Sequence, residues 1–167
     1  FFAAGGYASA WLSLNMNVSP WIGILIGGCC AVLLSLLIGF LTLRLRGIYT
    51  ALFTFAFQEM LRSIALLPEA TRWTGGPIGL IGVAGFSIMN IRSTYIDYYL
   101  GMGIFVVTTL MLYKVLNSKT GLALVAIGQS EVFAKTQGAN IFKYRFIAFI
   151  ISAFFTGVIG SFYAHYL

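Results

Sequence analysis

The sequence predicts an all-α, polytopic membrane protein. Hydrophobic residues make up 60% of the chain and charged residues only 8%, whereas about a quarter of a soluble protein is charged. The apolar residues also occur in blocks close to the ~20 residues that a helix needs to cross a bilayer. Because lipid offers backbone groups no partners, and the blocks lack the alternation of barrel strands, the blocks are expected to be helices.

Four full transmembrane spans are predicted. Their approximate bounds are 21–43, 48–67, 98–116 and 146–165. The apolar segment from Phe1 to Leu14 has the character of the end of an earlier span, and it lacks the basic start of a signal peptide. We therefore expect residues 1–167 to be an internal piece of a single, longer transmembrane domain.

Lysine and arginine gather on one side of the predicted membrane. Seven lie in the connections after the first and third full spans, and two lie in the connection 68–97. The seven are Arg44, Arg46, Lys114, Lys119, Lys135, Lys143 and Arg145, and the two are Arg72 and Arg92. Since basic connections stay in the cytoplasm, the loop 117–145 is predicted to be cytoplasmic and the loop 68–97 to be outside. This distribution also argues against nucleic acid as the partner of the basic residues.

The outer loop contains the glycine-rich run Thr74-Gly75-Gly76-Pro77, with further glycines at 79 and 82. A phosphate-binding loop is one interpretation, but no strand precedes the run and no Lys-Ser or Lys-Thr pair ends it. A tight loop that dips back toward the membrane fits the sequence better.

Glu59 and Arg62 are the ionisable residues deep in a predicted span, beside Gln58. At a spacing of i, i+3 they can pair on one helix face. One interpretation is an ion pair that stabilises the helix bundle, and the other is a pair that lines the path of a solute. In neither does Glu59 face lipid, where a central charge costs ~2.5–3.5 kcal/mol.

Small residues recur at four-residue spacing on two spans, as at Gly23 and Gly27 and again at Gly157 and Ser161. This spacing lets helix backbones approach closely, and we expect it to serve packing within one subunit rather than dimerisation. His165 lies just beyond the last span, where anchoring at the membrane interface explains it. No catalytic set or metal-ligand cluster can be assembled, so we expect no enzyme activity and no metal site.

A short helix is predicted inside the cytoplasmic loop. Ser130 is a good N-cap, Glu131 and Lys135 have the spacing of an i, i+4 ion pair, and Gly138 suits a helix C-terminus. The preceding segment 121–127 is too apolar to lie free in water. It is either an amphipathic helix on the membrane surface or a coupling element buried against a soluble partner.

Several motifs in one order resemble a known family nearly end to end. They are Arg44-Leu45-Arg46-Gly47-Ile48-Tyr49, Phe55-Ala56-Phe57-Gln58-Glu59-Met60-Leu61-Arg62, Thr74-Gly75-Gly76-Pro77, Gly121-Leu122-Ala123 and Tyr144-Arg145. In these motifs the chain resembles the membrane permease subunits of ABC importers of the branched-chain amino acid type.

The resemblance implies a multi-pass subunit of the cell (inner) membrane that forms the path of a branched-chain amino acid or similar small polar solute. Its implied partners are a second permease subunit, cytoplasmic ATPase subunits and an extracytoplasmic solute-binding protein. ATP and Mg are expected on the ATPase, with no cofactor on this chain. The implied ATPase-coupling residues are Gly121, Ala126, Ile127, Ser130, Glu131, Ala134, Lys135 and Gly138. The candidate translocation path comprises Gln58, Glu59, Arg62, Thr74, Gly75 and Gly76.

The chain departs from the family pattern at Leu124 and Gly128, where basic residues are usual, and at Phe133, where a second alanine is usual. Fewer charges would weaken electrostatic docking to the ATPase. The alternative functions are an ion-coupled secondary carrier or channel-like protein in which Glu59 titrates, and a membrane anchor that transports nothing.

The predicted orientation can be tested by labelling. Cysteines introduced at Lys119 and Lys135 should react only with reagents that reach the cytoplasm, and a cysteine at Arg72 should react from outside intact cells. Labelling of position 135 from outside would reverse the topology.

Overall fold

The computed structural model describes residues 1–43, 45, 48–76, 79–80, 82–83, 85–86 and 94–166, without the side chains of Arg72, Trp73 and Thr94. The helices are α1 (Phe2–Met16), α2 (Pro20–Thr42), α3 (Ile48–Ala65), α4 (Thr71–Thr74), α5 (Thr94–Leu116), α6 (Lys119–Gln129), α7 (Glu131–Thr136) and α8 (Ile141–Tyr166). The all-α prediction is confirmed for this part of the chain. Arg44, Arg46, Gly47, Pro77 and Arg92, which the sequence analysis used, lie outside the described residues.

In that part of the chain, three helices are long and apolar enough to cross a membrane, within Pro20–Thr42, Tyr95–Leu116 and Ile141–Tyr166. The predicted span 48–67 is also a helix, α3. It is not among the three, since Gln58, Glu59 and Arg62 interrupt its apolar sequence. Four helices therefore form where four spans were predicted, and three of them have the apolar character of a span.

The last helix begins at Ile141, five residues before the predicted span. Asn140 accounts for this earlier start, because its Oδ1 accepts a hydrogen bond from the backbone N–H of Lys143 at 3.1 Å. Such an N-cap allows the polar residues before the apolar run to join the helix. The loop between α5 and α8 is correspondingly shorter than 117–145.

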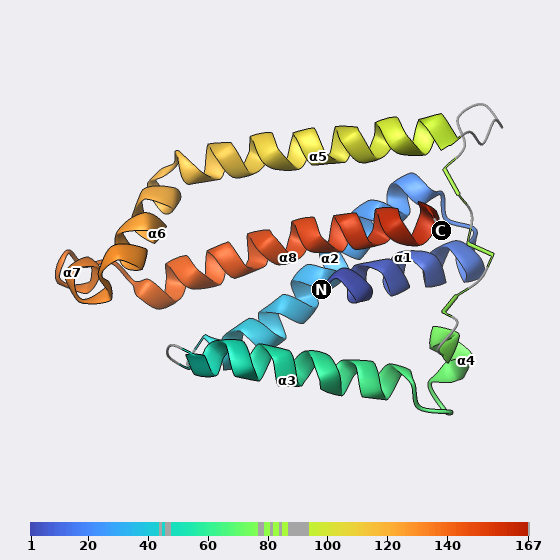
Figure 1. Ribbon diagram of the computed structural model, residues 1–167, viewed down its shortest axis with the longest axis horizontal. Coiled ribbons are helices and arrows are strands. Elements are labelled where there is room, and N and C mark those ends of the chain that lie inside the picture. Colours follow the sequence, from blue (N-terminus) through green and yellow to red (C-terminus); the bar gives the residue numbers. More distant parts are fainter. Residues whose placement is uncertain are drawn as a thin grey trace.

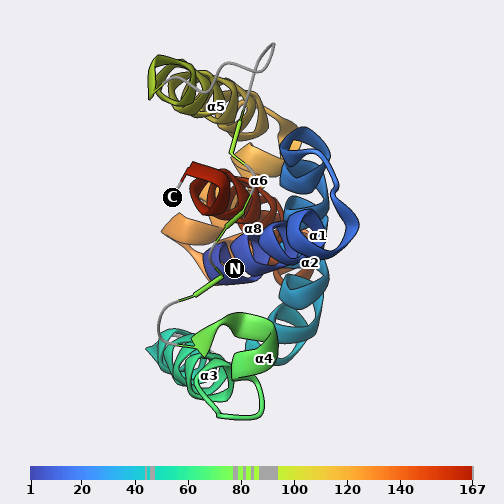
Figure 2. The ribbon, with the colours of Figure 1, turned by 90° about the vertical axis from the view of Figure 1, so that its right-hand side faces the viewer.

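The helices α1, α2 and α8 form a central group, with α3 and α5 on opposite sides of it (Figure 2). The end of α2, the start of α3, α6 and α7 lie toward one end of the elongated molecule, and α4 lies at the other (Figure 1). This is the arrangement that alternation of the spans requires. We refer to the end that carries α6 and α7, which the charges predict to be inside, as the cytoplasmic end.

Small residues allow the three central helices to approach within backbone contact. A Cβ atom added to Gly6 of α1 would lie 3.0 Å from the carbonyl oxygen of Gly160 in α8. The hydroxyl of Ser161, also in α8, lies 3.0 Å from the Gly5 carbonyl oxygen and 2.8 Å from that of Gly157. The predicted use of small residues for packing within one subunit is confirmed at these positions.

The prediction for His165 was wrong, because its side chain is 1% exposed and does not anchor at the interface. Its Nε2 lies 2.7 Å from the hydroxyl of Ser9. Ser9 belongs to α1 and is itself buried. The neighbouring sequence gives no sign of this contact, because Ser9 lies 156 residues before His165.

The outer loop returns to this end of the core through Phe86, which is fully buried. Its ring lies 5.6 Å from the rings of Trp21 and Phe162 and 5.5 Å from that of His165. Aromatic rings at such separations attract each other in addition to burying apolar area. Phe86 of the connection 68–97 thus packs against the core, while the dip of the glycine-rich run 74–82 toward the membrane stays a prediction.

The central packing predicts different effects of the same substitution, glycine to alanine, at Gly157 and at Gly103. A Cβ at Gly157 would lie 3.0 Å from the Gly27 carbonyl oxygen and 3.2 Å from the Gly28 Cα, whereas a Cβ at Gly103 would meet nothing within 4 Å. We expect Gly157→Ala to lower the free energy of unfolding by about 1–3 kcal/mol, the cost of overpacking. Gly103→Ala should be neutral or stabilising by up to about 1 kcal/mol, because alanine favours helix.

Thermal unfolding of the two purified variants in the same detergent measures this difference. Equal melting temperatures would show that α2 and α8 do not pack as closely as described.

Candidate functional site

Two serine caps begin the helices at the cytoplasmic end. The side chain of Ser118 accepts a hydrogen bond from the Gly121 N–H at 3.4 Å, which begins α6. Ser130 accepts one from the Phe133 N–H at 3.2 Å, which begins α7. The predicted helix of 130–137 with Ser130 as its N-cap is therefore confirmed, and Ser118 is a cap that the sequence analysis missed.

Gly138 ends α7 in the left-handed conformation, with φ of 80°. Its N–H donates to the Lys135 carbonyl at 3.0 Å, and the Ala139 N–H donates to the Ala134 carbonyl at 3.0 Å. These two bonds form a Schellman motif, which satisfies the last carbonyls of a helix and favours glycine at this position. The predicted role of Gly138 is confirmed.

Glu131 forms its ion pair with Arg145 of α8 rather than with Lys135 as predicted. The turn after α7 folds this helix back onto the first turns of α8, which brings the guanidinium within reach of the carboxylate. Both side chains are partly exposed, 49% for Glu131 and 33% for Arg145. Solvent screening therefore limits the pair to a contribution of ~0.2–1 kcal/mol, and its main effect is to fix the position of α7.

The predicted coupling residues divide into an inner and an outer set. Gly121, Ile127 and Ala134 are buried within the chain, and Ala126 is half-buried. These four residues pack within the chain, whereas the outer set, Ser130, Glu131, Lys135 and Gly138, is exposed. Their coupling roles stay a prediction. Phe133 of α7, which is not among the predicted coupling residues, is 61% exposed.

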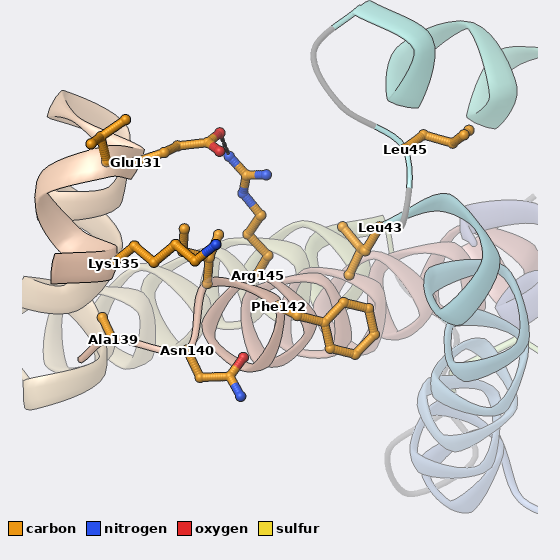
Figure 3. Close-up of a pocket in the computed structure, with 10 residues that line it drawn as sticks. Leu43, Leu45, Glu131, Lys135, Ala139, Asn140, Phe142 and Arg145 are labelled. Atoms are coloured by element: carbon orange, nitrogen blue, oxygen red, sulfur yellow. Dashed lines mark hydrogen bonds and ion pairs between the residues drawn. The ribbon is translucent and has the colours of Figure 1, made fainter.

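A pocket of about 580 Å³ lies between α7, the first turns of α8 and the end of α2. Glu131 and Lys135 reach into it from α7, Phe142 and Arg145 from α8, and Leu43 from the end of α2 (Figure 3). Charged side chains line one part of this pocket and apolar side chains line the other.

Glu59 and Arg62 form the predicted i, i+3 pair, with 3.7 Å between Oε2 and Nη1. Their side chains are 43% and 69% exposed, and Gln58 is exposed beside them. No residue of α3 is buried against the rest of the described chain. The expectation of a pair inside the bundle is therefore not met within this chain, and the pair stands on a face that the described residues leave open.

Thr74, Gly75 and Gly76 form a turn that ties α4 to the end of α3. The Thr74 hydroxyl donates to the Ala65 carbonyl at 2.8 Å and accepts from the Gly76 N–H at 3.2 Å. Gly75 and Gly76 have φ of 73° and 62°, a conformation that favours glycine. These residues shape the outer end of α3, far from α7 (Figure 1).

Among the described residues, no group of three or more His, Cys, Asp or Glu side chains is placed to hold a metal ion. Apolar spans around a small-residue core, with a capped helical hairpin at one end, define a multi-pass membrane protein with a structured loop between spans.

The chain belongs to the family described as the permease component of the branched-chain amino acid transport system, which it matches over residues 1–167. It is 26% identical to the high-affinity branched-chain amino acid transport system permease protein LivM of Escherichia coli (strain K12), over 98% of this chain and 44% of that protein. The LivM protein of Salmonella typhimurium gives the same values.

A further relative is the putative glucose ABC transporter permease protein TsgC13 of Haloferax volcanii, 29% identical over 95% of this chain and 49% of that protein. The chain thus spans about half the length of the curated relatives it matches. No solved structure matches it significantly. These findings place the chain among the permease components of ABC transporters and confirm the resemblance seen in its motifs.

The C-terminus of α7 yields a prediction. Gly138→Val should destabilise the helix end by roughly 1–2 kcal/mol, because a β-branched side chain makes the left-handed backbone conformation unfavourable. A steric clash does not contribute, since nothing lies within 4 Å of the added Cβ. Gly128→Val is the matched control, since that glycine is also free of neighbours and lies within α6 without a positive φ. Hydrogen exchange of the α7 amides should accelerate about tenfold in the first variant only. Unchanged exchange would contradict the assigned helix end.

Proposed function

We propose that this chain is the membrane-spanning part of an ABC importer that carries a branched-chain amino acid or a similar small polar solute across the cell (inner) membrane. A separate cytoplasmic ATPase drives the transport and acts on the chain through α6 and α7. The observation that supports this proposal best is the attachment of α7, which is held to α8 on one side and presents an exposed aromatic residue on the other.

The attachment gives α7 a mechanical connection to the core. Ala134 is buried, Glu131 pairs with Arg145, and the Schellman motif at Gly138 leads directly into α8. The 26 residues of α8 then run about 39 Å at 1.5 Å per residue, as far as His165 and Phe86 at the outer end. A displacement of α7 would therefore shift one rigid element that reaches both membrane surfaces.

Phe133 is the residue that we assign to the ATPase contact. A large aromatic side chain exposed on a helix that projects from the membrane is typical of a surface that a partner covers. Leu122 and Val125 of α6 are also more than half exposed and add apolar surface to the same end of the molecule (Figure 1). The phenylalanine replaces the alanine usual at this position, so apolar contact compensates for the charges that the loop lacks at Leu124 and Gly128.

We assign the open face of α3 to the solute path, formed together with a second permease subunit. Gln58, Glu59 and Arg62 provide polar groups on a helix that is otherwise apolar, and lipid would be an unfavourable neighbour for them. The outer end, where Phe86 closes the core, is where an extracytoplasmic solute-binding protein would dock. ATP and Mg would be bound by the ATPase and not by this chain.

The proposal predicts that Phe133→Asp weakens binding of the ATPase at least about tenfold. Loss of a central interface residue costs more than ~1.4 kcal/mol of binding free energy, and this corresponds to a tenfold change in affinity. Asn117→Asp is the matched control, since it adds the same charge to the same loop outside α7. Co-purification of the ATPase and solute-stimulated ATP hydrolysis by the whole complex measure the effect. Normal hydrolysis and normal assembly of the Phe133 variant would exclude α7 as the coupling contact.

A further inference from the structure

The pocket at the cytoplasmic end has features of a binding site apart from the ATPase contact. Its volume is about 580 Å³, and it opens where α2 ends and α8 begins (Figure 3). Leu43 and Phe142 form an apolar wall on the side of α2. Since α2 and α8 both have the apolar character of a membrane span and meet the pocket at their ends, we expect the pocket to lie at the boundary between lipid headgroups and hydrocarbon.

The charged side of the pocket has an excess of positive charge. The carboxylate of Glu131 is already paired with Arg145. The side chain of Lys135 lines the same pocket, makes no hydrogen bond or ion pair with another described residue, and extends toward Arg145 (Figure 3). Two cations therefore face one anion, and the ammonium group of Lys135 is left for a ligand.

Lys135 does not share the direction of Phe133. Residues two apart in a helix are separated by about 200° around its axis. The side of α7 that carries Lys135 faces α8 and the end of α2, where the pocket lies, and the side that carries Phe133 faces away. The excess charge is consequently directed toward the membrane boundary and not toward the surface that we assign to the ATPase.

We propose that this pocket binds the phosphate headgroup of an anionic phospholipid from the cytoplasmic leaflet. The phosphate would accept hydrogen bonds from Lys135 and Arg145, while the upper part of an acyl chain packs on Leu43 and Phe142. Basic pockets between spans on this side of a membrane attract such headgroups, and lysine binds phosphate as a point charge. The bound lipid joins α7 to the end of α2 and adds to the contacts with α8 that already hold the coupling helix.

The test measures lipid binding to the whole permease, purified with its partner subunits. Native mass spectrometry during titration with dioleoylphosphatidylglycerol gives the apparent affinity. Lys135→Gln should weaken it about fivefold, the effect of one basic residue near an anionic surface. Lys119→Gln removes the same charge from the same loop outside the pocket and should leave the affinity unchanged, as should Lys135→Arg.

Two further titrations identify the ligand. Dioleoylphosphatidylcholine should show no saturable binding that depends on Lys135, and millimolar inorganic phosphate should not displace phosphatidylglycerol. Displacement by phosphate would mean that the pocket binds a free anion instead of a lipid. Equal binding by Lys135→Gln and the wild type, or equal loss in the Lys119 variant, would overturn the proposal. None of these readouts depends on transport or on the ATPase contact.

Discussion

The structure depends on the close approach of α1, α2 and α8. Between helices in lipid there is no hydrophobic driving force, so packing contacts and hydrogen bonds have to hold them together. Here glycines bring the backbones into contact, and hydroxyl groups add polar bonds, as at Ser161 and between Ser9 and His165. The other helices are arranged around this group, and much of their surface is exposed in the described chain.

Packing in the central group fixes α8 along its length and at both ends. It is packed against α1 and α2, it continues from the turn that ends α7, and its last turn is covered by Phe86. A helix fixed in this way can transmit a displacement because its two ends cannot move independently. The family is that of permease components of a transport system, and in this arrangement α8 runs from the cytoplasmic end of the molecule, beside α7, to the opposite end (Figure 1).

The sequence was sufficient for what depends on local chemistry. It predicted the helical class, the apolar spans, the cap at Ser130 and the glycine that ends α7, since these follow from composition and from neighbouring residues. It did not predict contacts across the chain. Glu131 was assigned to Lys135, four residues away, because the return of α8 beside α7 cannot be deduced from spacing. His165 was assigned to the interface for the same reason, since α1 supplies its buried partner.

The bond between Ser9 and His165 has a consequence for biosynthesis. Its two groups are separated by 156 residues, so α1 and α2 enter the bilayer long before α8 is made. Until then Ser9 lacks this partner, and the glycines that will contact α8 face lipid instead. The core of this chain can therefore close only after α8 has been made.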